Sequence, residues 1–208
     1  MGGAWLGVIK IACACGRDDC LSLRRRPHNS ILCLADMAAA ARKKVALVWS
    51  RAATEQCRYL SNFQHVEGRG MCVTMPDDSR QWFRSIELAF HAHKFYYLAV
   101  ESRPDLAVAL SSDGVRGGVT GAAQKSAGGK AAMRRLGVAL DVQRWNAVAP
   151  AVLEKLVFSR AEHDPAYVNH CRDLVRSGYT IAHYSGRGGD KDHLGLGPAL
   201  TRLGNVML

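Results

Sequence analysis

One stripe of the sequence carries three side chains that could exchange protons. Glu87, His91 and Lys94 are spaced so that, on a helix, the carboxylate and the amine project from one face with the imidazole between them. The neighbouring Phe90 and Phe95 indicate that part of this helix is buried. Burial raises the pKa of a carboxylate and lowers that of an amine, which favours proton transfer or amine nucleophilicity near neutral pH. A solvent-exposed salt-bridge face is the alternative interpretation of the same stripe.

Three other stretches carry polar or aromatic side chains, each with two interpretations. Residues 60–63, which read Leu-Ser-Asn-Phe, either form a turn or contact a ligand. Trp82, just ahead of the stripe, is either a core side chain or a ligand contact. Residues 190–197 place charged side chains in a glycine-rich loop, where glycine either lets the backbone approach a ligand closely or serves an ordinary turn. Residues 128–130, Gly-Gly-Lys, lack the spacing of a phosphate-binding loop.

Taken together and in this order, these stretches resemble the NADAR (YbiA-like) family. The family pattern runs from LSNF through a Trp to ExxFxAxK, followed by a Trp-led helix, a glycine-rich loop and a closing helix. The resemblance covers residues 46–208 of this chain. The matching positions are residues 60–63, Trp82, residues 87–94, Trp145, Phe158, Gly178, residues 192–197 and residues 203–208.

Several positions depart from the family pattern. Leu194 stands where the family has its loop Trp, Val157 where it has a Lys, and Thr201 where it has an Asn. The glycine-rich loop is also shorter than in the family. Because Glu87 and Lys94 are intact, these departures indicate a divergent branch with an altered substrate preference.

The resemblance implies a YbiA-like α+β fold and hydrolysis of a ribosyl N-glycosidic bond. Lys94 would be the nucleophile that forms a Schiff base at the anomeric carbon, and Glu87 would be the acid/base. In the alternative within this class, Glu87 activates water directly and Lys94 only stabilises charge. The candidate substrate-binding residues are Ser61, Asn62, Phe63, Trp82, His91, Trp145, His183, Asp192 and Gly195.

Two substrates fit this reaction class, and one binding function competes with it. ADP-ribosylated guanine in nucleic acid is the first expectation, because a polyanionic substrate suits a basic protein. The alternative substrate is a phosphoribosylated intermediate of riboflavin synthesis. A further alternative is a non-enzymatic module that binds ADP-ribose or nucleic acid. The lysines and arginines are spread along the chain rather than clustered with aromatic residues, which favours the enzyme.

Composition narrows the class of protein. The chain has 208 residues, of which 48% are hydrophobic, enough for a sizeable core and unlike a wholly disordered protein. No apolar run approaches the roughly 20 residues that cross a bilayer, so we expect no membrane partner. The formal net charge of +10 favours polyanionic partners. The seven cysteines include no CxxC pair and the histidines show no ligand spacing, so we expect no metal, no cofactor, and reduced thiols in a cytoplasmic or nuclear protein.

The patterning along the chain predicts two regions and one fold class. Residues 1–44 would be an N-terminal extension, either disordered or a targeting segment, and residues 45–208 the NADAR-like catalytic domain. Short apolar runs predict strands at residues 45–49, 71–75 and 180–184. Helical periodicity predicts helices at residues 85–102, 104–110, 122–125, 142–160 and 165–177, and one that begins at residue 199. The prediction is a single α+β domain, mainly helical around a small β-sheet.

Overall fold

The computed structural model describes residues 44–184, residue 192 and residues 194–206. Every described residue belongs to one compact unit, which lies within residues 43–208. The prediction for the N-terminal extension therefore falls outside the described residues, apart from Lys44. Within the described ranges, no helix is both long enough and apolar enough to cross a lipid bilayer.

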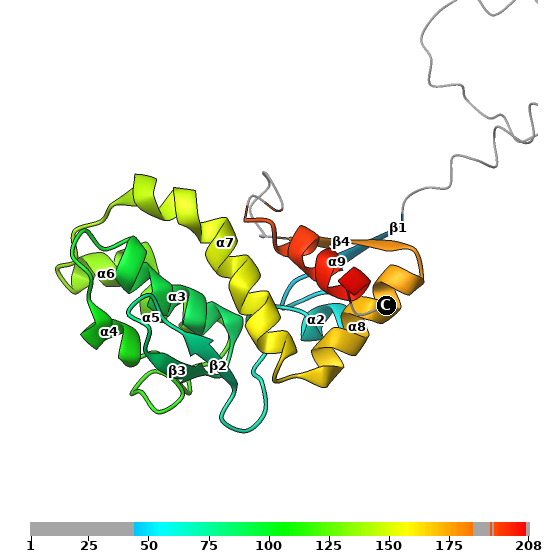
Figure 1. Cartoon of the computed structure of the whole chain (residues 1–208), viewed down its shortest axis with the longest axis horizontal. Coiled ribbons are helices and arrows are strands. Elements are labelled where there is room, and N and C mark those ends of the chain that lie inside the picture. The colour runs from blue at the N-terminus through cyan, green and yellow to red at the C-terminus, as the bar shows by residue number, and fades with distance from the viewer. Residues whose placement is uncertain (1–43, 185–191, 193, 207–208) are drawn as a thin grey trace, which may run out of the picture. The chain divides into compact units, whose positions relative to one another are not determined.

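The described strands form two separate two-stranded sheets (Figure 1). Strand β1 (Lys44–Val48) pairs in parallel with β4 (Tyr179–His183), with Ala46 opposite Ile181. Strand β2 (Met71–Thr74) pairs in antiparallel fashion with β3 (Arg80–Phe83). The three predicted strands are thus confirmed, while β3 was not predicted. The first and last strands can pair in parallel because the intervening helices carry the chain back across.

Helices make up about half of the described chain and far more of it than strands, which confirms an α+β domain that is mainly helical. The short loop regions are more helical than predicted: α5 is longer than residues 122–125, and α2 and α6 were not predicted. Short helices of five to seven residues have little intrinsic stability, so their sequences carry a weak signal. The helices are α2 (Glu55–Tyr59), α3 (Ile86–Tyr97), α4 (Pro104–Val108), α5 (Ala122–Gly128), α6 (Lys130–Arg135), α7 (Val142–Ala161), α8 (Pro165–Arg176) and α9 (Leu196–Val206).

Helix α3 is the central helix of the candidate site. It begins after Ser85, whose hydroxyl accepts a hydrogen bond from the backbone N–H of Leu88 and so caps the helix. Most of its residues are buried, because it packs against α4, α5, α7 and β3 (Figure 1). A helix surrounded in this way must bury its polar side chains along with its apolar ones.

Helix α7 is the longest helix and contacts elements far apart in the sequence. It packs against α3 and β2 on one hand and against α8 and α9 on the other (Figure 1). Its buried residues include Trp145, near its start, and Arg160, near its end. These two side chains therefore enter the interior of the protein at opposite ends of α7.

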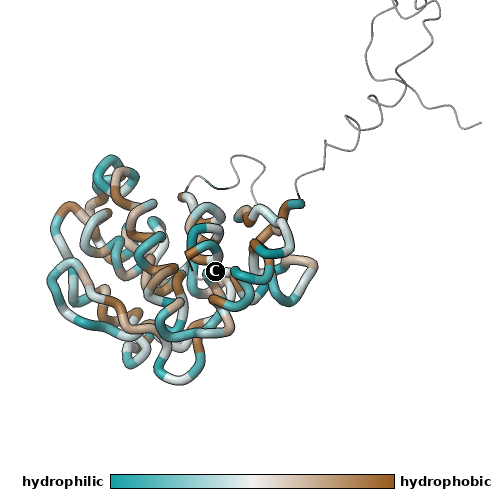
Figure 2. Tube along the Cα trace, turned by 45° about the vertical axis from the view of Figure 1, so that its right-hand side comes forward, coloured by the Kyte–Doolittle hydropathy of each residue, from teal (hydrophilic) through white to brown (hydrophobic). Residues whose placement is uncertain are grey.

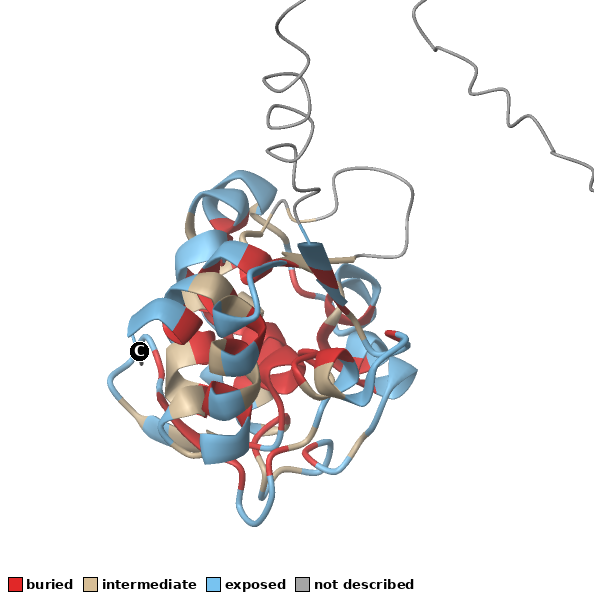
Figure 3. Cartoon of the chain, turned by 90° about the vertical axis from the view of Figure 1, so that its right-hand side faces the viewer, coloured by how far each residue is buried: buried red, intermediate tan, exposed pale blue. Residues whose placement is uncertain are grey.

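Helix α8, unlike α3, buries a single face, as its sequence requires. In α8 the buried residues are Tyr167, Val168, Cys171 and Leu174, which follow helical spacing. Hydrophobic and hydrophilic stretches alternate along the chain in Figure 2, and Figure 3 shows buried residues inside and exposed ones on the outer faces. The described cysteines, Cys57, Cys72 and Cys171, are buried free thiols, and burial raises the pKa of Cys171 to about 12.

Candidate functional site

The predicted stripe on α3 forms a continuous chain of polar contacts. The Nε2 atom of His91 lies 3.2 Å from Oε1 of Glu87, and Nζ of Lys94 lies 2.9 Å from Nδ1 of His91. Glu87 is 8% exposed and His91 is 3% exposed, while Lys94 is half-buried. The alternative of a solvent-exposed salt-bridge face is therefore wrong, because α4, α5 and α7 pack around this helix.

The donors and acceptors of this chain fix the tautomer of His91. A charged lysine carries only donors, so the Nδ1 atom of His91 must accept from Lys94. The proton of a neutral imidazole then resides on Nε2, which faces the carboxylate of Glu87. Both ring nitrogens of His91 are thus directed at protein groups.

Burial and charge set the protonation states. Burial lowers the pKa of Lys94 to about 8, against the opposing charge of Glu87. Burial also lowers the pKa of His91 and so favours the neutral imidazole. Lys125, on α5, adds a positive charge that acts on all three groups. The predicted lowering of the pKa of the Lys94 amine is confirmed.

The predicted direction of the pKa shift of Glu87 was wrong. Burial does act to raise its pKa, but the contact with His91 and the charges of Lys94 and Lys125 outweigh burial, so the pKa lies below its usual range. The carboxyl group is therefore ionised at neutral pH. It begins any reaction as a base rather than as an acid.

Two aromatic rings enclose the amine. The Nζ atom of Lys94 lies 5.0 Å from the ring centre of Phe90 and 5.6 Å from that of Trp145. The two rings meet edge to face, with centres 4.9 Å apart. Aromatic faces stabilise an ammonium ion while keeping water away from it. Trp145, a candidate substrate-binding residue on α7, is thereby brought into the same site.

The backbone of residues 61–63 is fastened to the start of α3. The carbonyl of Asn62 accepts a hydrogen bond from the backbone N–H of Glu87 at 3.0 Å. The side chain of Asn62 is buried, and its Oδ1 atom has no hydrogen-bond partner among the described residues. A buried acceptor without a partner is costly, and a ligand that donates a hydrogen bond would satisfy it.

Phe63 is held by a buried glutamine. Gln124, on α5, donates through Nε2 to the carbonyl of Phe63 at 3.1 Å and accepts from the hydroxyl of Ser85 at 2.7 Å. The Nζ atom of Lys125 lies 5.3 Å from the centre of the Phe63 ring. One short helix thus ties the loop to the cap of α3 and places a lysine over the aromatic ring.

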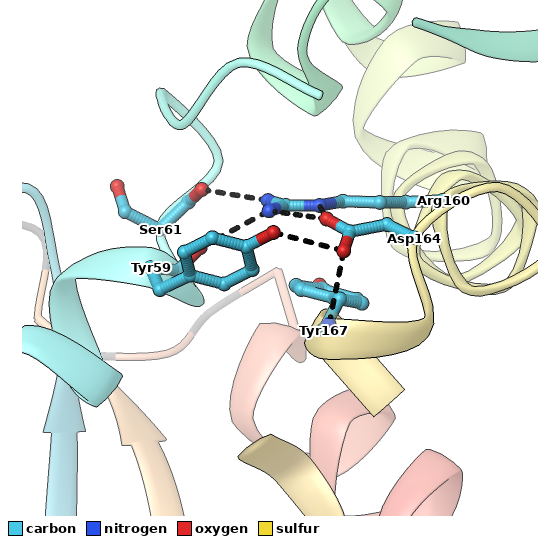
Figure 4. Close-up of polar contacts among 5 residues, drawn as sticks. All are labelled: Tyr59, Ser61, Arg160, Asp164 and Tyr167. Atoms are coloured by element: carbon cyan, nitrogen blue, oxygen red, sulfur yellow. Dashed lines mark hydrogen bonds and ion pairs between the residues drawn. The ribbon is translucent and has the colours of Figure 1, made fainter. Parts of the chain in front are cut away.

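A buried arginine that the sequence analysis did not predict holds the preceding residues (Figure 4). Arg160 is fully buried and donates to the carbonyls of Tyr59 and Ser61 at 3.2 and 3.3 Å. Its guanidinium also binds the carboxylate of Asp164 through two hydrogen bonds, of 2.9 and 3.0 Å. The rings of Tyr59 and Tyr167 lie 5.2 and 4.1 Å from it.

The same cluster supplies the hydrogen bonds that the buried carboxylate of Asp164 needs. Its Oδ1 atom accepts from the hydroxyl of Tyr59 at 2.9 Å and from the backbone N–H of Tyr167 at 3.1 Å. The ion pair therefore links the end of α7 and the start of α8 to the backbone that leads into Asn62. The only sequence signal for this link was an arginine and an aspartate spaced by four residues.

The other candidate residues have their described contacts elsewhere. Trp82, on β3, lies 5.4 Å from the guanidinium of Arg69 and 5.3 Å from the ring of His163. His183 ends β4, and its charge acts on Asp192. Asp192 accepts from the backbone N–H of Gly197 at 2.8 Å, and Gly195 adopts a left-handed backbone between them. This last arrangement caps the start of α9.

A pocket of about 570 Å³ lies apart from the stripe, between β1, α2 and α8. Trp49, Arg51 and Asp173 are among its lining residues, and its lining includes none of the candidate catalytic or binding residues. Within the described ranges, no group of three His, Cys, Asp or Glu side chains could hold a metal ion. The chemistry of the stripe, rather than this pocket, identifies the candidate site.

A second histidine on α3 makes a prediction about stability. Burial lowers the pKa of His93 to about 4, whereas an exposed histidine titrates near 6.5. Between these values the unfolded chain binds a proton that the folded chain does not, so stability decreases as pH falls through this range, by about 1.4 kcal/mol per pH unit for one such group. We expect His93→Asn to lose less stability than wild type between pH 7 and pH 4, measured by urea unfolding. Equal losses in both proteins would contradict this assignment.

Comparison with known proteins produced no match: no protein family, no curated protein and no solved structure matches this chain. The function is therefore argued from the site itself. Its distinctive features are an amine with a lowered pKa, an ionised buried carboxylate and the imidazole that lies between them.

Proposed function

We propose that this protein hydrolyses ribosyl N-glycosidic bonds, with Lys94 as the nucleophile and Glu87 as the acid/base. The observation that carries the proposal is the half-buried amine of Lys94, whose pKa is about 8 and which lies one imidazole away from an ionised carboxylate. At pH 7 about a tenth of such an amine is uncharged and nucleophilic. The resemblance to the NADAR family supports the reaction class.

The reaction proceeds through a covalent intermediate. The uncharged Lys94 amine attacks the anomeric carbon, the bond from that carbon to the base nitrogen breaks, and its electron pair remains on the base. A proton then moves from the new carbon–nitrogen linkage to the ring oxygen as the sugar ring opens, which leaves a Schiff base. Water adds its oxygen to the anomeric carbon, and both of its protons pass to the nitrogen, so that Lys94 leaves in its charged form and the sugar is released as the aldehyde, which closes again to a ring.

Glu87 handles the proton of the leaving base. Because its carboxyl group begins ionised, it gains a proton as Lys94 loses one, and it passes this proton to the base nitrogen as the glycosidic bond breaks. The carboxylate that results can stabilise the positive charge at the anomeric carbon. In the alternative mechanism Glu87 activates water directly and no covalent intermediate forms.

The surrounding residues supply substrate contacts. The rings of Phe63 and Trp145 offer faces for a base or a ribose, and Oδ1 of Asn62 offers an acceptor for a ribose hydroxyl. Lys125 is exposed and its charge acts within the site, which favours a substrate that carries phosphates.

ADP-ribosylated guanine in nucleic acid is the proposed substrate, because it combines a ribosyl–nitrogen bond with two phosphates and a polyanionic carrier. A phosphoribosylated intermediate of riboflavin synthesis is the second candidate. Incubation of the protein with ADP-ribosylated DNA and with the riboflavin intermediate, side by side, tests the choice. Release of base from only the second substrate would reverse the order, and release from neither would favour a binding module.

A conservative change at Glu87 tests its role. We expect Glu87→Gln to lower turnover of the cleaved substrate by roughly 10²- to 10³-fold, because the amide cannot donate a carboxylic proton to the leaving base. Glu154→Gln is the matched control, since Glu154 lies on the surface in an ion pair with Arg202. A Glu87→Gln variant as active as the Glu154→Gln variant would remove Glu87 from the mechanism.

A further inference from the structure

Neither ring nitrogen of His91 is open to a substrate, because one is bonded to Lys94 and the other is buried against Glu87. Its Nδ1 atom lies 2.9 Å from the amine of Lys94, and its Nε2 atom lies 3.2 Å from the carboxylate of Glu87. The side chain is 3% exposed. A residue that is enclosed in this way acts on the reaction through its neighbours.

The packing of α5 against α3 holds the imidazole in place. Gly128 lies so close to His91 that a Cβ atom at this position would meet the Cβ of His91 at 2.5 Å and its Cγ at 2.9 Å. Only glycine permits this approach, which accounts for a glycine in a helix that also supplies Gln124 and Lys125. The imidazole is therefore confined from outside the helix as well as along it.

We propose that His91 is a positioning residue that sets the distance and orientation between the Lys94 amine and the Glu87 carboxylate, through a hydrogen bond to the amine and a 3.2 Å contact with the carboxylate. This inference rests on the proposed roles of Lys94 and Glu87, and it assigns His91 a task other than substrate contact. A neutral imidazole can accept from Lys94 and donate to Glu87 at the same time, whereas a protonated one can only donate.

The positioning is therefore sensitive to acid. Protonation of His91 at Nδ1 removes the acceptor for Lys94 and places two positive groups side by side. The charged groups that act on His91 are Glu87 and Lys94 on its own helix and Lys125 on α5. Because burial lowers the pKa of His91 below that of an ordinary histidine, this loss sets in only at a pH below the range in which an exposed histidine gains its proton.

Two substitutions separate positioning from other roles. Glutamine at this position can still donate to the carboxylate and accept from the amine, but it does not titrate and cannot relay a proton. Leucine fills similar space and makes neither bond. His91→Gln and His91→Leu thus keep the helix filled while they differ in the two contacts.

The first measurement does not need the substrate. Competitive labelling of Lys94 by acetic anhydride across pH 5 to 10, read by mass spectrometry, reports the pKa and reactivity of its amine in each protein. We expect His91→Gln to titrate close to wild type, and His91→Leu to titrate at lower pH because its amine has lost an acceptor. Indistinguishable Lys94 titration in all three folded proteins would overturn the proposal.

The second measurement is turnover of the cleaved substrate between pH 5 and 8. We expect His91→Leu to lose about 10²-fold and His91→Gln less than about 10-fold. Both wild type and His91→Gln should slow as acid protonates the Lys94 amine, but the additional fall that comes from protonation of His91 should be absent from His91→Gln. Equal large losses in both variants would overturn positioning in favour of proton relay. If labelling separates the variants but no protein cleaves any substrate, the positioning role stands and the proposed function fails.

Discussion

Lys94→Met is expected to abolish covalent trapping and to lower hydrolysis by about 10³-fold or more. Methionine keeps the length of the side chain over Phe90 and Trp145 but removes the amine that attacks the sugar. With wild type, borohydride should reduce the Schiff base to a stable adduct whose site is Lys94, detected by mass spectrometry of the digested protein. The size of the loss reflects the removal of a step that no other described group on the stripe can perform.

The matched control is Lys155→Met, a lysine on the exposed face of α7. This variant should form the reduced adduct and hydrolyse the substrate as wild type does. If wild type gives no adduct and Lys94→Met retains activity, Lys94 is not the nucleophile and direct activation of water by Glu87 takes its place. An adduct on another lysine would equally remove Lys94 from the proposed role.

Arg160→Met is expected to cost about 3–5 kcal/mol of unfolding free energy, because it leaves the buried Asp164 without its cationic partner. The carbonyls of Tyr59 and Ser61 would also lose their donor. Urea unfolding at pH 7 measures the change. Where the variant remains folded, turnover should also fall, since the displaced backbone leads directly into Asn62.

Two further variants make this result specific. Arg202→Met breaks an exposed ion pair with Glu154 and should cost no more than about 1 kcal/mol. The double variant Arg160→Met/Asp164→Leu removes both buried charges and should be more stable than Arg160→Met alone. If Arg160→Met were as stable as Arg202→Met, the buried pair would not hold residues 59–61.

Local sequence patterns were sufficient to predict the longer helices. The N-cap Ser85 and the apolar spacing that follows it predicted α3, and the same periodicity predicted α7. Pro165 and Gly178 marked the two ends of α8. The spacing of Glu87, His91 and Lys94 also predicted that they share one face, because three and four residues are neighbouring positions on any helix.

Elements that depend on contacts outside their own segment were missed. The strand β3 exists because β2 pairs with it, and the short helices α5 and α6 lie where the sequence predicted mainly loop. Strand pairing likewise divided the expected small sheet into two, since β1 pairs with the distant β4. None of these partners can be identified from the spacing of residues within one segment.

The sequence by itself determined which groups could do chemistry: an acid, an imidazole and an amine on one helical face beside aromatic rings. Only the tertiary structure decided how far these groups are buried and which of them are charged. It buried the stripe beneath α5 and α7, placed Trp145 at the amine, and surrounded Glu87 with enough positive charge to lower its pKa rather than raise it. The reason is physical: residue spacing is a local property of the helix, whereas burial and electrostatic interaction depend on what the rest of the chain brings alongside.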